Sequence, residues 1–118
     1  MGTNKRAKGE IFEQRAAQFL VAQGGQIVTR NFNCRMGEID IICFLEPTLV
    51  FVEVRFRGQN RYGGAAATIS PQKQNKIKRS AMFYLQSNGY NVAHTRFRFD
   101  VIAFDSNIEQ LNWIKNAF

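Results

Sequence analysis

The sequence predicts a single α/β domain in which two helices flank a mixed β-sheet, and three observations support this prediction. Two strongly apolar runs, residues 39–45 and 49–56, lie on either side of the turn signal Glu46-Pro47-Thr48, as in an antiparallel β-hairpin. Segments with apolar residues at helical spacing come before and after this hairpin. With 118 residues, 45% of them hydrophobic, the chain is long enough for one packed core but not for two.

The elements before the hairpin follow from spacing and from glycine. Residues 9–23 predict a first helix, because apolar residues recur there at helical spacing and Gly24-Gly25 ends the pattern. Residues 1–8 are polar and basic, and we expect them to form a flexible arm. A short strand is expected at residues 27–32.

The elements after the hairpin begin with a strong helix signal. Ser70-Pro71 is typical of an N-cap followed by the first helical residue, so a second helix should run from there to about residue 86. Residues 95–104 and 110–114 then predict two strands. The second helix would be the crossover that joins strand 49–56 to strand 95–104 in parallel, which gives the order α-β-β-β-α-β-β.

Charged residues interrupt the two apolar strands of the hairpin. Glu38 and Asp40 lie in the first strand, Glu53 and Arg55 in the second, and each pair shares one face of its strand. Buried carboxylates are costly unless a partner compensates them. One interpretation is an ion-pair network in which Arg55 bridges Glu53 and Asp40, and spacing alone favours it. The other is a Mg²⁺ site, because hard oxygen ligands suit that ion.

Composition limits the partners and the location. Sixteen Lys and Arg against nine Asp and Glu give a net charge of +7, which favours a polyanionic partner, nucleic acid before membrane, over a merely basic surface. No run reaches the roughly 20 apolar residues of a membrane span, and no signal segment is evident, so we expect a cytoplasmic protein. Two cysteines without CxxC spacing and one histidine favour free thiols over zinc or a disulfide. No nucleotide-binding fingerprint occurs, so no small-molecule cofactor is expected.

The hairpin also carries a family resemblance. Gly-Glu-Ile-Asp, a turn and Val-Phe-Val-Glu-Val-Arg resemble the two-part motif of the PD-(D/E)xK nuclease superfamily. The chain is more closely similar to the YraN family of small bacterial predicted endonucleases, related to Holliday-junction resolvases. The matching stretches are residues 9–20, 37–40, 51–57, 62–66, 73–74, 98–101 and 113–118. The resemblance implies a restriction-endonuclease-like fold and hydrolysis of phosphodiester bonds in DNA, branched or junction DNA included, with Mg²⁺ or Mn²⁺.

The resemblance implies roles for the residues of the hairpin. Asp40 and Glu53 would hold the metal, with the backbone carbonyl of Val54 as a third ligand and Glu38 in support behind them. Arg55 would contact the phosphate, at a position where the superfamily has Lys. Because a guanidinium cannot act as a general base, a non-catalytic nucleic-acid-binding protein that keeps the nuclease fold remains the alternative function.

Residues outside the hairpin complete the predicted site. Glu13 would join the acidic residues, although a Glu early in a helix is also stabilised by the helix dipole, and both interpretations stay open. Gln74, next to Lys73 at the start of the second helix, would orient a water or the phosphate. The basic and aromatic residues expected to contact nucleic acid are Arg57, Arg61, Tyr62, Lys73, Lys76 and Arg79. The preferred DNA structure, DNA against RNA, and monomer against homodimer stay open.

Overall fold

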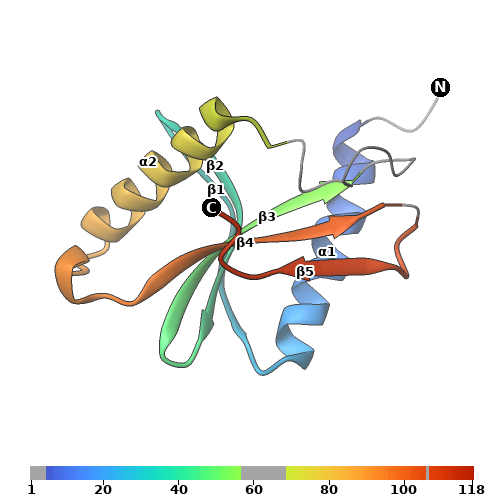
Figure 1. The fold of residues 1–118 in the computed structure, drawn as a ribbon, viewed down its shortest axis with the longest axis horizontal. Helices are drawn as coiled ribbons and strands as arrows, with labels where there is room; N and C mark the ends of the chain where they lie inside the picture. The colour runs from blue at the N-terminus through green and yellow to red at the C-terminus, as the bar shows by residue number, and fades with distance from the viewer. Residues whose placement is uncertain (1–4, 57–68, 106) are drawn as a thin grey trace.

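The fold was obtained as a computed structural model that describes residues 5–56, 69–105 and 107–118 (Figure 1). Its helices and strands are α1 (Lys5–Ala22), β1 (Gln26–Cys34), β2 (Gly37–Leu45), β3 (Thr48–Phe56), α2 (Pro71–Ser87), β4 (Phe97–Phe104) and β5 (Leu111–Ile114). A short 3-10 helix, η2 (Val92–His94), precedes β4. The predicted order α-β-β-β-α-β-β is confirmed.

The five strands form one sheet in the order β1-β2-β3-β4-β5. β3 and β4 are parallel, and the other neighbouring pairs are antiparallel. The α2 helix is the crossover between the two parallel strands, as the sequence predicts. Figure 1 shows α1 and α2 on opposite faces of the twisted sheet.

Each face of the sheet packs against one helix. On the α1 side, the buried residues are Phe12, Ala16, Ala17, Leu20, Ile41, Cys43, Val50, Val52, Ile102 and Phe104. On the α2 side, they are Ile39, Ile42, Leu49, Phe51, Ile77, Ala81, Tyr84, Leu85 and Phe99. In β3 the even-numbered residues therefore face α1 and the odd-numbered ones face α2. This alternation directs Glu53 and Arg55 toward the α2 side.

Several boundaries differ from those that the sequence predicts. α1 begins at Lys5, inside the segment expected to be an arm, and ends before Gly24, whose φ of 95° fits the predicted glycine stop. β1 extends to Cys34 because it pairs with β2 as far as Gly37. β4 begins at Phe97, because the preceding residues form η2.

The start of α2 is confirmed in detail. Ser70 has an extended backbone, and its Oγ accepts a hydrogen bond from the backbone N of Lys73 at 3.1 Å. Pro71 is the first helical residue. This N-cap fixes the position of the first turn of α2 relative to the sheet.

Asp100 in β4 is fully buried and holds the C-terminal part of the chain. Its carboxylate accepts hydrogen bonds from Nε and Nη2 of Arg98 at 2.9 and 3.2 Å, the pair that the sequence suggests. It also accepts from Trp113 Nε1 and from the backbone N of Asn116, both at 2.9 Å. These four donors compensate the buried charge, so Asp100 links β4 to β5 and to the chain that follows.

Two expectations from composition can be compared with the structure. Cys34 and Cys43 are free thiols, as expected. Among the described residues, no helix combines the length and the apolar character that crossing a membrane requires.

Candidate active site

The two strands of the hairpin separate at one end, and Asp40 lies where they separate. Pairing between β2 and β3 stops at Ile41 and Val52, although β2 begins at Gly37 and β3 continues to Phe56. Beyond that point, Oδ2 of Asp40 accepts a hydrogen bond from the backbone N of Val54 at 2.8 Å. The Asp40 carboxylate thus takes the place of a strand partner for Val54. We call this region the β2–β3 fork.

Glu53 lies beside Asp40 in the β2–β3 fork and is only 5% exposed. Its carboxyl group is hydrogen-bonded to that of Asp40. Two cations approach its Oε2 atom: Nη1 of Arg55 at 3.5 Å and Nζ of Lys73 at 3.7 Å. The structure therefore brings together the two carboxylates of the predicted metal site, and it also contains part of the ion-pair network that the spacing suggested.

The electrostatics of the fork are dominated by burial. Burial and the neighbouring charge of Asp40 raise the pKa of Glu53 from 4.5 to about 8, although Lys73 and Arg55 act in the opposite direction. Burial also raises the pKa of Asp40, against the hydrogen bonds from Val54 and Glu53. Two adjacent buried carboxylates repel each other when both are ionised. Near neutral pH and without a further cation, Glu53 is therefore mostly protonated and donates a hydrogen bond to the carboxylate of Asp40.

Glu13 extends the acidic cluster from the opposite helix. It lies in α1 and is half-buried, and its Oε1 atom is buried without a hydrogen-bond partner among the described residues. Burial and the charge of Asp40 raise its pKa to about 6, while Arg30 acts to lower it. The position of Glu13 agrees with a role at the acidic site, and the helix dipole alone does not account for the influence of Asp40.

Glu38 and Gln74 border the fork. Glu38 is exposed, and its charge contributes to the raised pKa values of Asp40 and Glu13, which is compatible with a supporting role. Gln74 is half-buried in the first turn of α2, where its Nε2 donates to the carbonyl of Ile69 at 3.1 Å. That hydrogen bond fixes the orientation of the amide. Its predicted role toward a water or phosphate stays a prediction.

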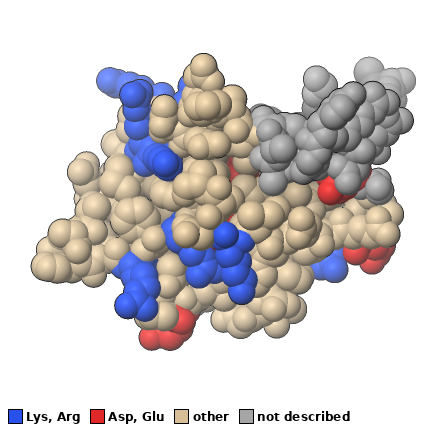
Figure 2. Space-filling view, in the orientation of Figure 1, with Lys and Arg blue, Asp and Glu red and all other residues tan. Residues whose placement is uncertain are grey.

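Lys73 lies at the fork, apart from Lys76 and Arg79, and its predicted contact with nucleic acid stays a prediction. Residues three apart on a helix shift by about 60° at each step, so Lys73 and Arg79 point in clearly different directions. Lys73 instead shares a face with the buried Ile77, one turn further on, and it reaches Glu53. The four-residue spacing between Lys73 and Ile77 is the sequence signal that could have predicted that Lys73 faces the sheet. Lys76 and Arg79 are exposed, and Figure 2 shows Lys and Arg side chains gathered over α2.

Some predicted contacts cannot be placed. Arg57, Arg61 and Tyr62 lie outside the described residues. Val54 is described: its backbone N faces Asp40, while the predicted use of its carbonyl as a metal ligand stays a prediction.

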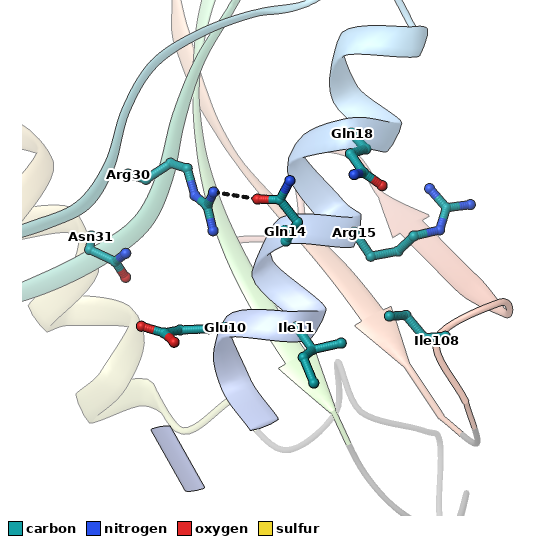
Figure 3. A pocket seen from close by; sticks show the side chains of 8 residues that line it. All are labelled: Glu10, Ile11, Gln14, Arg15, Gln18, Arg30, Asn31 and Ile108. Atoms are coloured by element: carbon teal, nitrogen blue, oxygen red, sulfur yellow. Dashed lines mark hydrogen bonds between the residues drawn. The ribbon is translucent and has the colours of Figure 1, made fainter. Parts of the chain in front are cut away.

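A pocket among the described residues lies elsewhere. It measures about 750 Å³ and lies along α1, and none of the predicted site residues lines it (Figure 3). Its lining residues are Glu10, Ile11, Gln14, Arg15, Gln18, Arg30, Asn31 and Ile108. Nη1 of Arg30 donates to Oε1 of Gln14 at 2.8 Å across its wall. The acidic cluster is therefore a candidate site because of its chemistry and not because of a large cavity.

The donor set of the fork fits a magnesium ion of a particular kind. Within the described parts of the chain, no three His, Cys, Asp or Glu side chains are arranged to hold a metal ion together. The buried Glu53 and the partly buried Asp40 nevertheless offer two adjacent carboxylates whose repulsion a cation would remove. Mg²⁺ is commonly held by one or two carboxylates and retains several waters. The two carboxylates of the fork fit such an ion, and a contribution of Glu13 stays a prediction.

Comparison with known proteins identifies the relatives of this chain. The model of the uncharacterised protein family UPF0102 matches residues 12–104. A UPF0102 protein of Aliivibrio salmonicida is 45% identical over 97% of this chain and 93% of its own length. Relatives of the same description from Aeromonas hydrophila and Colwellia psychrerythraea are 51% and 46% identical, over 95% and 98% of this chain and 85% and 92% of their own lengths. The chain therefore belongs to the UPF0102 family, which is the YraN family that its hairpin motif resembles.

Proposed function

We propose that this protein is a metal-dependent endonuclease that hydrolyses phosphodiester bonds in DNA. The observation that carries the proposal is the β2–β3 fork, where the carboxyl groups of Asp40 and Glu53 are hydrogen-bonded to each other beside the cations of Arg55 and Lys73. Structural ion pairs do not require two carboxylates in contact. Two carboxylates in contact destabilise the fold unless a cation or a proton compensates their charge. Such pairs are typical of functional sites.

The residues of the fork have complementary tasks in this reaction. A bound Mg²⁺ would lower the pKa of a water and offset negative charge on the phosphate, each a contribution of several kcal/mol. Asp40 and Glu53 would hold it, and Arg55 and Lys73, both at the rim of the fork, would contact the phosphate by charged hydrogen bonds. Water would add to phosphorus and lose a proton to solvent, while the phosphorus–oxygen bond to the leaving group breaks and the leaving oxygen takes up a proton from solvent. Because Arg55 stays protonated, its task is to bind the phosphate rather than to accept a proton.

The net charge of +7 and the exposed Lys76 and Arg79 support a nucleic-acid substrate. Arg55 also favours the second candidate function, a nucleic-acid-binding protein without turnover. Its guanidinium lies 3.5 Å from Glu53, so it neutralises part of the charge that would otherwise attract a metal ion.

Cleavage assays on linear, flapped and four-way-junction DNA, with Mg²⁺, Mn²⁺ or EDTA, separate these two functions. We expect metal-dependent cleavage by the parent protein and none by Asp40→Asn, because Asn can accept the hydrogen bond from Val54 but carries no charge. Glu38→Gln is the matched control, since Glu38 is an exposed carboxylate of the same strand. If the parent protein binds these DNAs and cleaves none of them with either metal, the non-catalytic function is the correct one.

A further inference from the structure

Two aromatic rings at the far end of α2 are unusually exposed. Phe83 is 43% exposed and Tyr90 is 38% exposed. Each contacts a ring closer to the core: Phe83 lies 6.4 Å from Phe32, and Tyr90 lies 6.2 Å from Tyr84. Phe32 and Tyr84 are themselves 5.2 Å apart, so the four rings form one continuous cluster. The cluster holds the exposed rings in place and leaves part of each in contact with water.

Positive charge accompanies these rings along the same side of α2. Lys76 and Arg79 precede Phe83 by seven and four residues, a spacing that places all three on one side of a helix, and both are exposed. The turn between β1 and β2 lies beside Lys76, because a Cβ at Gly37 would be 3.5 Å from the Cβ of Lys76. We call the surface formed by Lys76, Arg79, Phe83 and Tyr90 the α2 flank.

The α2 flank is connected to the β2–β3 fork by the helix itself. Lys73, which contacts Glu53, lies ten residues before Phe83, or about 15 Å along the helix axis. Lys76, three residues after Lys73, points in a direction between those of Lys73 and Phe83, so a ligand bound at the fork would pass Lys76 to reach the rings.

The chemistry of the flank favours an unpaired nucleic-acid strand. Proteins that bind single strands combine a basic surface for the backbone with aromatic rings on which bases stack. A duplex keeps its bases paired and offers the rings little to stack on. A second copy of this chain would bring another net charge of +7 against Lys76 and Arg79, which opposes self-association through the flank.

We propose that the α2 flank binds a single-stranded segment adjacent to the scissile phosphate, with bases stacked on Phe83 and Tyr90. The preferred substrate is then DNA in which an unpaired strand meets the bond to be cut. This inference rests on nucleic-acid binding at the proposed site, but it does not require that hydrolysis occurs.

The test is fluorescence anisotropy with labelled oligothymidine and with a blunt duplex of the same length, both in EDTA. Phe83→Leu and Tyr90→Leu remove a ring but keep an apolar side chain against the cluster, and Ile11→Ala, which changes an exposed apolar residue of α1, is the control. We expect each ring variant to lose about five- to 150-fold in affinity for oligothymidine, which is the loss expected for one base stack. Duplex binding and the control should be unchanged.

Several outcomes would overturn the inference. If the parent protein binds oligothymidine and the ring variants bind it equally well, the flank is not the single-strand site, while the proposed function stands. If the parent protein binds neither DNA, both proposals fail. Sedimentation velocity of the same variants covers the remaining case: a dimer of the parent protein that Phe83→Leu dissociates would make the flank a subunit interface.

Discussion

Replacing Glu53 by Gln should remove the loss of stability that the metal-free protein shows as pH rises. Gln has nearly the same shape and can donate a hydrogen bond to Asp40, but it cannot ionise. In the parent protein the pKa of Glu53 rises from 4.5 to about 8 on folding. Below pH 4.5 both the folded and the unfolded chain bind this proton, and above pH 8 neither does. Between these values the folded chain binds more protons, so its stability falls as pH rises.

The size of the effect follows from that interval. Each pH unit between the two pKa values lowers the free energy of unfolding by about 1.4 kcal/mol. The free energy of unfolding of the parent protein should therefore fall by up to about 5 kcal/mol between pH 4.5 and pH 8. The loss belongs to the pair of carboxylates, since Asp40 and Glu53 titrate together. Glu53→Gln should lack this loss, and at pH 8 to 9 it should be more stable than the parent protein in EDTA.

Urea denaturation in EDTA, at several pH values from 5 to 9, measures both profiles. Glu46→Gln is the control, because Glu46 is an exposed carboxylate in the turn of the same hairpin. Its profile should follow that of the parent protein. If the parent protein and Glu53→Gln show the same pH dependence, Asp40 and Glu53 do not share a buried proton, and the electrostatic basis of the proposed site is wrong.

Three further predictions concern metal, phosphate and fold. Mg²⁺ should bind the parent protein with a calorimetric signal and stabilise it by about 2.7 kcal/mol at a hundredfold excess over Kd, whereas Asp40→Asn should show neither effect. Arg55→Lys should keep the cleavage rate within about tenfold of that of the parent protein, or about 1.4 kcal/mol of barrier, and Arg55→Ala should stay folded and lower the rate by on the order of 10². An Arg55→Ala protein that unfolds would indicate a structural ion pair. One that is folded and fully active would exclude both the phosphate-binding and the ion-pair role of Arg55. Asp100→Asn should lower the free energy of unfolding, measured by urea denaturation, by about 3 to 5 kcal/mol, because it leaves Arg98 without its buried, charged partner. A decrease of less than about 1 kcal/mol would contradict the linking role of Asp100.

The parts of the fold that depend on local chemistry could be predicted from the sequence. The alternation of apolar residues in β3 determines which side chains face each helix, and Ser70-Pro71 determines where α2 begins. The boundaries of β1 and β4 could not be predicted, because pairing with β2 and hydrogen bonds of the Asn91 side chain and carbonyl set them. These contacts join residues that no local pattern relates.

The candidate site was only partly predictable for the same reason. Asp40 and Glu53 stand out as charges within apolar strands, but the separation of β2 from β3 is a property of the assembled sheet. Lys73 seemed to belong with Lys76 and Arg79, since a three-residue spacing resembles a stripe over short distances. Its contact with Glu53 depends on where the Ser70 N-cap places the helix relative to β3.

The hydrogen bond from Val54 to Asp40 has a consequence for how the protein could change over evolutionary time. One oxygen of Asp40 holds the backbone of β3, and the negative charge of the group would serve the proposed chemistry. An Asn at this position would preserve the hydrogen bond from Val54 and remove the negative charge. The substitution requires only that one oxygen be replaced by an amide nitrogen. A lineage could therefore turn a nuclease of this design into a DNA-binding protein in one step, with the sheet intact. Conversely, an aliphatic residue there would damage the sheet before selection on activity could act.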